Sequence, residues 1–310
     1  MYHEERKQKF LQGASERTKK VFLETAPFEE EMGKDVCEMS QEELQYIADN
    51  ALGVLPVTLQ ERSVVLSNYR TWCAEHGFET SPLEEPLQLD PTNKIRKCMV
   101  ATPAHLQTEL NRYFDPPERE TVDCLYRCYF WMAFMGLKEA DALEVKTEEV
   151  DLEQGVIRRG GKVYELDPMA MPAFRSACTL DSFVYVHPKY KQPIRRGRKE
   201  SPYLMRGPRT KKIGDTTIRT LIYHHMGATE KGLGLSYLRV WYSGAFYRAY
   251  KMEQMGFSPN FDAITLEASK RGKLSQETLR RRVFGMKKNY AGWKKAFPAF
   301  LPDGPEHTKR

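Results

Sequence analysis

The stretch Cys128-Tyr-Phe-Trp-Met-Ala-Phe-Met-Gly-Leu137 is apolar over all ten of its residues. A helix that crosses a bilayer needs about 20 apolar residues, so this run is too short to span a membrane. A helix that is apolar on every side must instead lie inside a domain. The run therefore predicts the end of a central helix over residues 118–136, in the second half of the chain.

Beyond that helix, the sequence predicts a short helix over residues 138–145 and then a hairpin. Val156-Ile-Arg-Arg159 and Lys162-Val-Tyr-Glu-Leu166 have strand composition, and Gly160-Gly161 between them tolerates the positive φ angles of a two-residue turn. Further helices are predicted over residues 169–178, 216–226, 235–255 and 276–290. The pattern as a whole predicts a mainly α fold with a small antiparallel β-sheet.

The first half of the chain reads as helical. Ser40-Gln-Glu-Glu43 and Thr58-Leu-Gln-Glu61 both have the pattern of a capping box, in which the hydroxyl and the later carboxylate each satisfy a backbone N–H. They predict helices that begin at Ser40 and at Thr58, the second of which ends near Gly77.

A proline pair marks the predicted domain boundary. Thr102-Pro103 predicts the start of a helix, and Asp115-Pro116-Pro117 ends it, because proline disfavours helix at the preceding residue. We therefore predict a helical domain over residues 1–115 and a second domain over residues 116–310.

Charge is distributed unevenly between these halves. Residues 1–115 hold 13 Lys/Arg and 20 Asp/Glu, a net charge of −7, whereas the remainder holds 35 basic and 22 acidic residues, a net charge of +13. Such asymmetry predicts a polyanionic partner for the second half, against the alternative of a solvated basic surface without a partner.

Composition argues against several other classes. The six cysteines include no C-x2-C pair, so we expect reduced thiols and no zinc ribbon, metal or other cofactor. The N-terminal residues lack the apolar region of a secretory signal. These features predict a cytoplasmic protein that does not associate with membranes.

Two motifs resemble the catalytic domain of the tyrosine recombinases, or phage integrases. Phe134-Met-Gly-Leu-Lys-Glu-Ala-Asp-Ala-Leu143, followed by residues 150–157, resembles the start of that domain, and Ser236-Tyr-Leu-Arg239 resembles the family's HxLRH box. The helices over residues 40–114 resemble the family's core-binding domain, which clamps the far side of the duplex. The resemblance implies an integrase-like fold with a helical core-binding (SAM-like) domain and a catalytic-like domain.

Part of the family's phosphate site is retained. In that family two arginines hold the phosphate, a hairpin lysine protonates the leaving oxygen and a tyrosine attacks, so positioned cations do much of the work. By the resemblance, Lys138 replaces the first arginine, Lys162 matches the hairpin lysine and Arg239 matches the second arginine. A lysine cannot make the two-pronged contact of an arginine.

The cleaving groups are missing. Ser236 and Val240 replace the two histidines of the box, and Thr278-Leu-Arg-Arg281 has arginine where the tyrosine should follow. The resemblance therefore implies a degenerate enzyme with no catalytic residues. The enzyme alternative is an active site-specific recombinase with a relocated nucleophile, for which Tyr290 is the candidate.

Three further segments resemble a more specific group of integrase-like proteins. Residues 239–250, 126–131 and 66–72 look like an integrase-like family of phage and mobile-element proteins, a group similar to the recombinase-fold repressors of the lytic cycle of temperate phages. This implies a non-catalytic, sequence-specific protein that binds double-stranded DNA, of prophage or mobile-element origin, acting as a transcriptional regulator or repressor. A protein-interaction adaptor that has lost DNA binding is a further alternative.

Two basic segments, residues 189–212 and 270–295, are expected to contact phosphates, because each neutralised phosphate releases a counterion. Arg280, Arg281 and Arg282 point about 100° apart on a helix, so not all of them can contact one duplex and at least one should be structural or solvated. Residues 297–301 form an apolar tail that would pack on a second copy in a homo-oligomer. The predicted DNA-binding residues are Lys138, Lys162, Arg195, Arg196, Arg198, Lys199, Arg206, Arg209, Lys211, Lys212, Arg239, Arg280 and Arg281.

Overall fold

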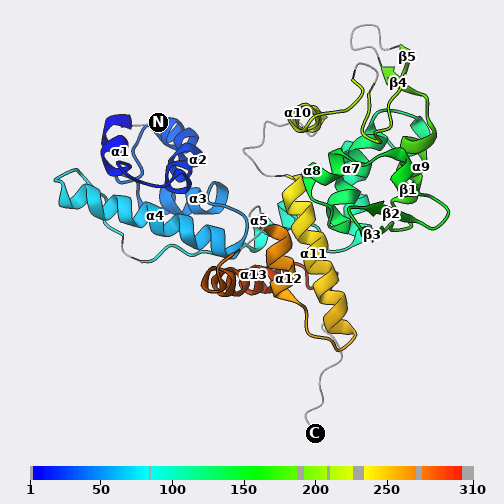
Figure 1. Ribbon diagram of the computed structural model, residues 1–310. Helices are drawn as coiled ribbons and strands as arrows, with labels where there is room; N and C mark the ends of the chain where they lie inside the picture. Colours follow the sequence, from blue (N-terminus) through cyan, green and yellow to red (C-terminus); the bar gives the residue numbers. More distant parts are fainter. Residues whose placement is uncertain are drawn as a thin grey trace. The chain divides into compact units, whose positions relative to one another are not determined.

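A computed structural model of the chain confirms the predicted fold class, mainly α with small antiparallel sheets (Figure 1). The structure describes residues 3–83, 85–186, 192–207, 210–225, 234–269 and 274–301. It divides into two compact units: the first is built from residues within 1–97 and 261–298, and the second from residues within 98–230, 234–260 and 299–310. Each unit is considered by itself below.

Helices make up the first unit. They are α1 (Glu4–Phe10), α2 (Glu16–Met32), α3 (Gln41–Asn50), α4 (Pro56–Glu75), α5 (Thr92–Cys98), α12 (Phe261–Ala268) and α13 (Gln276–Ala296). The capping box predicted at Ser40 is present, with both reciprocal hydrogen bonds. Apolar faces of α2, α3 and α4 meet in a core around Phe22, Ile47 and Tyr69, all of them fully buried.

The capping box predicted at Thr58 is wrong. Helix α4 begins at Pro56, its N-cap is Leu55, and no side chain of the N-cap accepts a hydrogen bond. Proline is favoured at this first position because its own N–H is not needed there. The next N–H, that of Val57, donates to Asn289 Oδ1 of α13 at 3.1 Å. A residue distant in sequence therefore does the work that the local pattern assigned to a cap.

The second unit surrounds helix α7. Its helices are α6 (Pro103–Tyr113), α7 (Asp123–Met135), α8 (Glu139–Leu143), α9 (Met171–Thr179), α10 (Asp215–His225) and α11 (Tyr237–Gln254), with 3-10 turns η1 (Pro117–Arg119) and η2 (Thr147–Glu149). Every residue of α7 from Asp123 to Phe134 is buried, as the apolar run predicts. The helix begins later than predicted, because residues 117–119 form the separate turn η1 and Glu120 has a φ of 54°.

Helix α11 lies unusually close to α7. A Cβ added to Gly244 would come within 1.8 Å of the carbonyl oxygen of Phe134, so this contact requires glycine. Arg248 of α11 also donates to that oxygen, at 2.6 Å. These contacts fix the long helix that carries Arg239 onto the central helix.

Two small sheets complete the second unit. One is β1 (Val150–Asp151), β2 (Val156–Arg159) and β3 (Lys162–Glu165) in that order, all antiparallel. Its β2–β3 turn is the predicted one, with φ of 58° at Gly160 and 74° at Gly161. The other sheet pairs β4 (Ser182–Val186) with β5 (Pro193–Gly197). This second sheet was not predicted from the sequence.

The division into units differs from the boundary predicted at residue 115. Arg127 of α7 is 1% exposed and donates to Asp115 O at 2.8 Å, Phe114 O at 2.7 Å and Asn111 Oδ1 at 2.9 Å. These hydrogen bonds tie the end of α6 to the second unit. The C-terminal helices α12 and α13, predicted in the second domain, belong to the first unit.

Two general expectations concern membranes and metals. Among the residues that the structure describes, no helix is both long and apolar enough to cross a membrane. The same residues contain no cluster of three or more His, Cys, Asp or Glu side chains arranged to hold a metal ion. All six cysteines are free thiols.

Candidate nucleic-acid interface

The start of α11 lies against the turn that precedes Lys138. The hydroxyl of Tyr237 donates to Leu137 O at 2.9 Å, and Trp241 Nε1 donates to Gly136 O at 3.0 Å. Both donors come from the first two turns of α11, next to Arg239. The segments that carry Lys138 and Arg239 are therefore neighbours.

These two cations differ in their surroundings. Lys138 is exposed at the N-cap of α8. Arg239 is half-buried, and its Nη1 donates to Gly234 O at 2.8 Å. Ser236, which stands where the recombinase motif has histidine, is the N-cap of α11, and its hydroxyl accepts from the backbone N–H of Arg239.

The β2–β3 hairpin carries the third predicted cation, Lys162. Lys162 is exposed on β3, and Tyr164 lies on the same face of that strand because side chains alternate. Burial raises the pKa of Tyr237 well above its ordinary value, and nearby Tyr129, Glu139 and Tyr164 add to that rise electrostatically. The segments that carry Lys138 and Arg239 thus meet at Tyr237, and Tyr164 of the hairpin is near enough to affect that hydroxyl electrostatically.

Sequence reasoning missed an ion pair beside this cluster. Glu139 accepts from the hydroxyl of Tyr129 and from two guanidinium nitrogens of Arg219, with Arg219 Nε at 2.9 Å from Oε1 and Nη2 at 2.5 Å from Oε2. The hydrogen bond to Glu139 raises the pKa of Arg219. Arg219 lies on α10, so its charge near Lys138 is a property of the tertiary structure, and Glu139 balances it.

Arg195 and Arg196 are exposed on strand β5. Arg195 forms an ion pair with Glu120, and the guanidinium carbon of Arg196 lies 5.5 Å from the centre of the Tyr185 ring. Because an exposed ion pair contributes little free energy, Arg195 stays available for a phosphate. Both residues are exposed, and their DNA-binding role stays a prediction.

Arg198 does not fit it. Its Nη1 donates to Ala177 O at 2.6 Å and Leu180 O at 3.0 Å, and its Nη2 donates to Leu204 O at 2.9 Å. Its guanidinium also lies over the ring of Phe183 at 4.9 Å, and burial lowers its pKa to about 10. Ala177 and Leu180 are at the end of α9, so Arg198 caps that helix instead of facing a ligand.

Arg206 does not fit the predicted DNA-binding role either, because it is bonded to groups of the protein itself. Its Nη1 donates to Ser201 O at 2.9 Å, Thr147 Oγ1 at 3.1 Å and Tyr203 O at 3.2 Å. The side chain is half-buried and closes the loop that follows β5. We therefore remove Arg198 and Arg206 from the predicted DNA-binding set.

The other predicted residues of this segment are exposed lysines, with one exception. Lys199 and Lys211 are exposed, and Lys212 pairs with Glu144 and lies 5.2 Å from the centre of the Tyr203 ring. The hydrogen bond with Glu144 raises the pKa of Lys212. Arg209 lies outside the described residues.

In the first unit, α13 separates the three consecutive arginines. Arg280 and Arg281 are exposed and form no ion pair with any described residue. Arg282 is also exposed, but its Nη1 donates to Ser269 Oγ at 3.2 Å, so it is the one of the three with a hydrogen bond to another segment.

Tyr290, the candidate relocated nucleophile, is only 4% exposed. Its ring is stacked on Trp293 with the ring centres 6.0 Å apart, and it contacts Phe261 at 5.3 Å. An attacking hydroxyl must reach a phosphate, and this side chain is instead part of the packing between α12 and α13.

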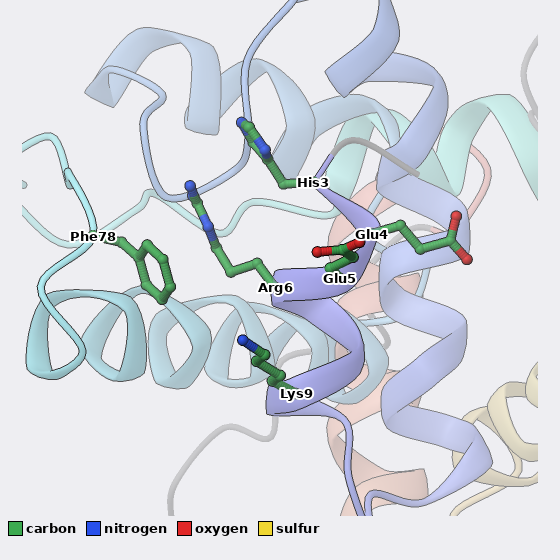
Figure 2. A pocket seen from close by; sticks show the side chains of 6 residues that line it. All are labelled: His3, Glu4, Glu5, Arg6, Lys9 and Phe78. Carbon is green, nitrogen blue, oxygen red and sulfur yellow. The ribbon is translucent and has the colours of Figure 1, made fainter.

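A shallow hollow of about 400 Å³ lies in the first unit, between α1 and the end of α4 (Figure 2). Arg6 and Phe78 line it together with His3, Glu4, Glu5 and Lys9. Arg6 pairs with Glu38 at 3.1 Å and lies over the Phe78 ring at 4.4 Å. Its mixed charges give no net attraction for a polyanion.

Comparisons with known proteins give two likenesses. Residues 1–75 match the family model described as "MrpR, N-terminal core-binding domain". Among solved structures, the chain is similar to an integrase from mycobacterium phage Brujita, with 15% sequence identity, a TM-score of 0.30, and coverage of 92% of this chain and 90% of that one. No curated protein matches the sequence.

Proposed function

We propose that this protein binds double-stranded DNA at specific sequences without cutting it, and that it acts as a transcriptional regulator or repressor of prophage or mobile-element origin. The observation that carries the proposal is the match of residues 1–75 to a core-binding domain model. In the recombinase family that the sequence resembles, the core-binding domain clamps the duplex.

The exposed cations of the second unit support the DNA-binding part. Lys138 and Arg239 lie on neighbouring segments, and Tyr164, on the hairpin that carries Lys162, acts electrostatically on Tyr237. Cations on neighbouring segments would suit a phosphate, and contacts to phosphates fix the register of a protein on DNA. The remaining exposed cations, Arg195, Arg196, Lys199, Lys211 and Lys212, would extend these contacts.

The non-catalytic part rests on what has replaced the cleaving groups. Ser236 caps a helix with its hydroxyl, Arg281 occupies the position of the nucleophile, and Tyr290 is buried under Trp293. Lys138 lacks the paired donors with which arginine fixes a phosphate. A chain that keeps the phosphate contacts and lacks these groups would bind a DNA site without breaking a strand.

An assay for a covalent adduct tests this part. A nicked suicide substrate traps any protein–phosphotyrosine intermediate, so the full-length chain and Tyr290→Phe are incubated with it and separated under denaturing conditions. We expect no adduct from either. An adduct from the unsubstituted chain that disappears with Tyr290→Phe would establish an active recombinase and overturn the proposal.

Genomic binding tests the DNA-binding part. The tagged chain is footprinted across its source genome, and the recovered fragments are titrated at several salt concentrations. We expect discrete sites and an affinity that falls steeply as salt rises. Equal, negligible binding to every fragment at low salt would instead favour a protein-interaction adaptor.

A further inference from the structure

Helix α13 packs on the first unit through uncharged groups. Met286, Tyr290 and Trp293 are buried on one side of it. A Cβ added to Gly292 would lie 2.6 Å from the Pro56 side chain, and Asn289 accepts from the N–H of Val57. The helix is thus held in place by apolar contacts and a hydrogen bond on this side, and these contacts do not involve the cations of its opposite side.

The opposite side of α13 is basic. At 100° per residue, the exposed positions of this side fall within a sector about 120° wide, and from residue 280 to residue 295 they extend along about 22 Å. The only acid of the helix is Glu277, which is exposed in the first turn and falls within the same sector. We call this side the α13 basic face; its residues are Arg280, Arg281, Phe284, Lys287, Lys288 and Lys295.

These cations are not neutralised by the fold. Lys287 lies 5.9 Å from the centre of the Phe261 ring and Lys288 lies 4.8 Å from that of Phe284, contacts that leave their ammonium groups in solvent. The ion pair of Lys295 with Asp90 is 3.8 Å long and exposed on both sides, at 74% and 63%. A pair of this kind contributes little free energy and yields readily to another anion.

The positive charge of the first unit is concentrated in its C-terminal segment. Residues 1–97 hold 12 Lys/Arg and 18 Asp/Glu, a net charge of −6, whereas residues 261–298 hold 10 and 3, a net charge of +7. Residues 1–97 and the C-terminal segment therefore carry opposite net charges, and the cations of that segment form a concentrated strip on one helix. Such a strip attracts a polyanion and orients the unit on it, because the rest of the unit is repelled.

We propose that the α13 basic face is a second duplex-contact surface, carried by the first unit, with its cations on phosphates and Phe284 against sugar or a thymine methyl group. The proposal rests on the proposed function, because the ligand is the same duplex. A length of about 22 Å matches about six nucleotides of one strand at 3.4 Å each. Phe284 is 62% exposed amid cations, and apolar contacts of this kind accompany phosphate contacts in DNA interfaces.

Charge reversal tests the face in the full-length chain. The variant Arg280→Glu/Arg281→Glu/Lys288→Glu is compared with Arg17→Glu/Lys19→Glu/Lys20→Glu, which changes the net charge equally on α2. Arg17, Lys19 and Lys20 each pair with a glutamate, so that control face is already balanced. Thermal melts establish that both variants are folded.

We expect the α13 variant to bind a footprinted duplex at least about 10-fold more weakly than the control at physiological salt, with a salt slope that is shallower by about 2 to 3. Equal affinities and slopes for the two variants would overturn the proposal. If the unsubstituted chain binds no duplex, the proposed function itself fails, a result visible before any variant is made. Loss of binding to a poly-glutamate peptide with unchanged duplex affinity would assign the face to an acidic protein and would also overturn it.

Phe284→Ala separates the apolar contact from the charges. We expect a loss of affinity of about 3- to 10-fold with an unchanged salt slope, because no phosphate contact is removed. An unchanged affinity would exclude Phe284 from the interface.

Discussion

The segment around β5 and helix α13 are similarly rich in cations, yet the structure uses these cations differently. In the β5 segment, Arg198 and Arg206 turn inward and donate to backbone carbonyls. On α13, Arg280 and Arg281 remain in solvent. A helix satisfies its own interior carbonyls, whereas a helix end or an irregular loop leaves carbonyls without partners, and arginine is well suited to fill that need. A cluster of cations therefore predicts an exposed anion-binding surface more reliably on a helix than in a loop.

The largest effect that would test this comparison is on stability. Arg198→Ala leaves the carbonyls of Ala177, Leu180 and Leu204 without their donor, and we expect it to lower the free energy of unfolding by about 2–4 kcal/mol. Chemical denaturation monitored by circular dichroism measures it. Arg196→Ala, two residues away and exposed, should stay within about 0.5 kcal/mol of the unsubstituted chain. Equal losses in the two variants would contradict the structural role of Arg198.

Arg239 has features of both groups of arginines, because it is half-buried and donates to Gly234 O but lies beside the segment of Lys138, where we propose a phosphate contact. We expect Arg239→Ala to weaken duplex binding by about 1–3 kcal/mol. A titration at fixed salt measures the change, and a melting curve separates it from unfolding. Full affinity in a folded Arg239→Ala variant would remove this residue from the interface.

Arg195 and Arg196 test the exposed half of the β5 segment. Reversing both to glutamate should leave the unfolding free energy nearly unchanged and should lower the slope of log affinity against log salt by about 2, at about 0.9 per lost phosphate contact. Affinities measured at four or more salt concentrations give the slope. If the slope does not change, strand β5 lies outside the interface.

The smallest effect distinguishes neighbours on α13. Arg281→Ala should reduce the salt slope by about 1, whereas Arg282→Ala should leave it unchanged, because Arg282 is bonded to Ser269. The same titrations serve for both variants. A reversed order would show that the orientation of the helix on DNA differs from the one proposed.

Local patterns predicted much of the fold. The apolar run ending at Leu137, the glycine pair of the hairpin and the capping box at Ser40 all form as expected, because each depends on residues close in sequence. The box at Thr58 failed because the N–H of Val57 is satisfied by Asn289, 232 positions away. No local rule contains that information.

The site was predictable to a similar extent. The resemblance to recombinases brought the segments of Lys138 and Arg239 into one site, and the contacts of Tyr237 and Trp241 give that proximity a physical basis. Charge alone did not separate Arg198 from Arg196, since the carbonyls that capture Arg198 come from α9 and from Leu204. Arg219 was missed because only the folded chain brings α10 to Glu139.

The bond between Asn289 and Val57 has a consequence for biosynthesis. A ribosome releases residues 1–97 long before it reaches α13, and domains tend to fold as they emerge. Here the N–H of Val57, in the first turn of α4, has no partner from α13 until residue 289 has been made. Premature termination before α13 would therefore yield a fragment in which the start of α4 lacks this hydrogen bond.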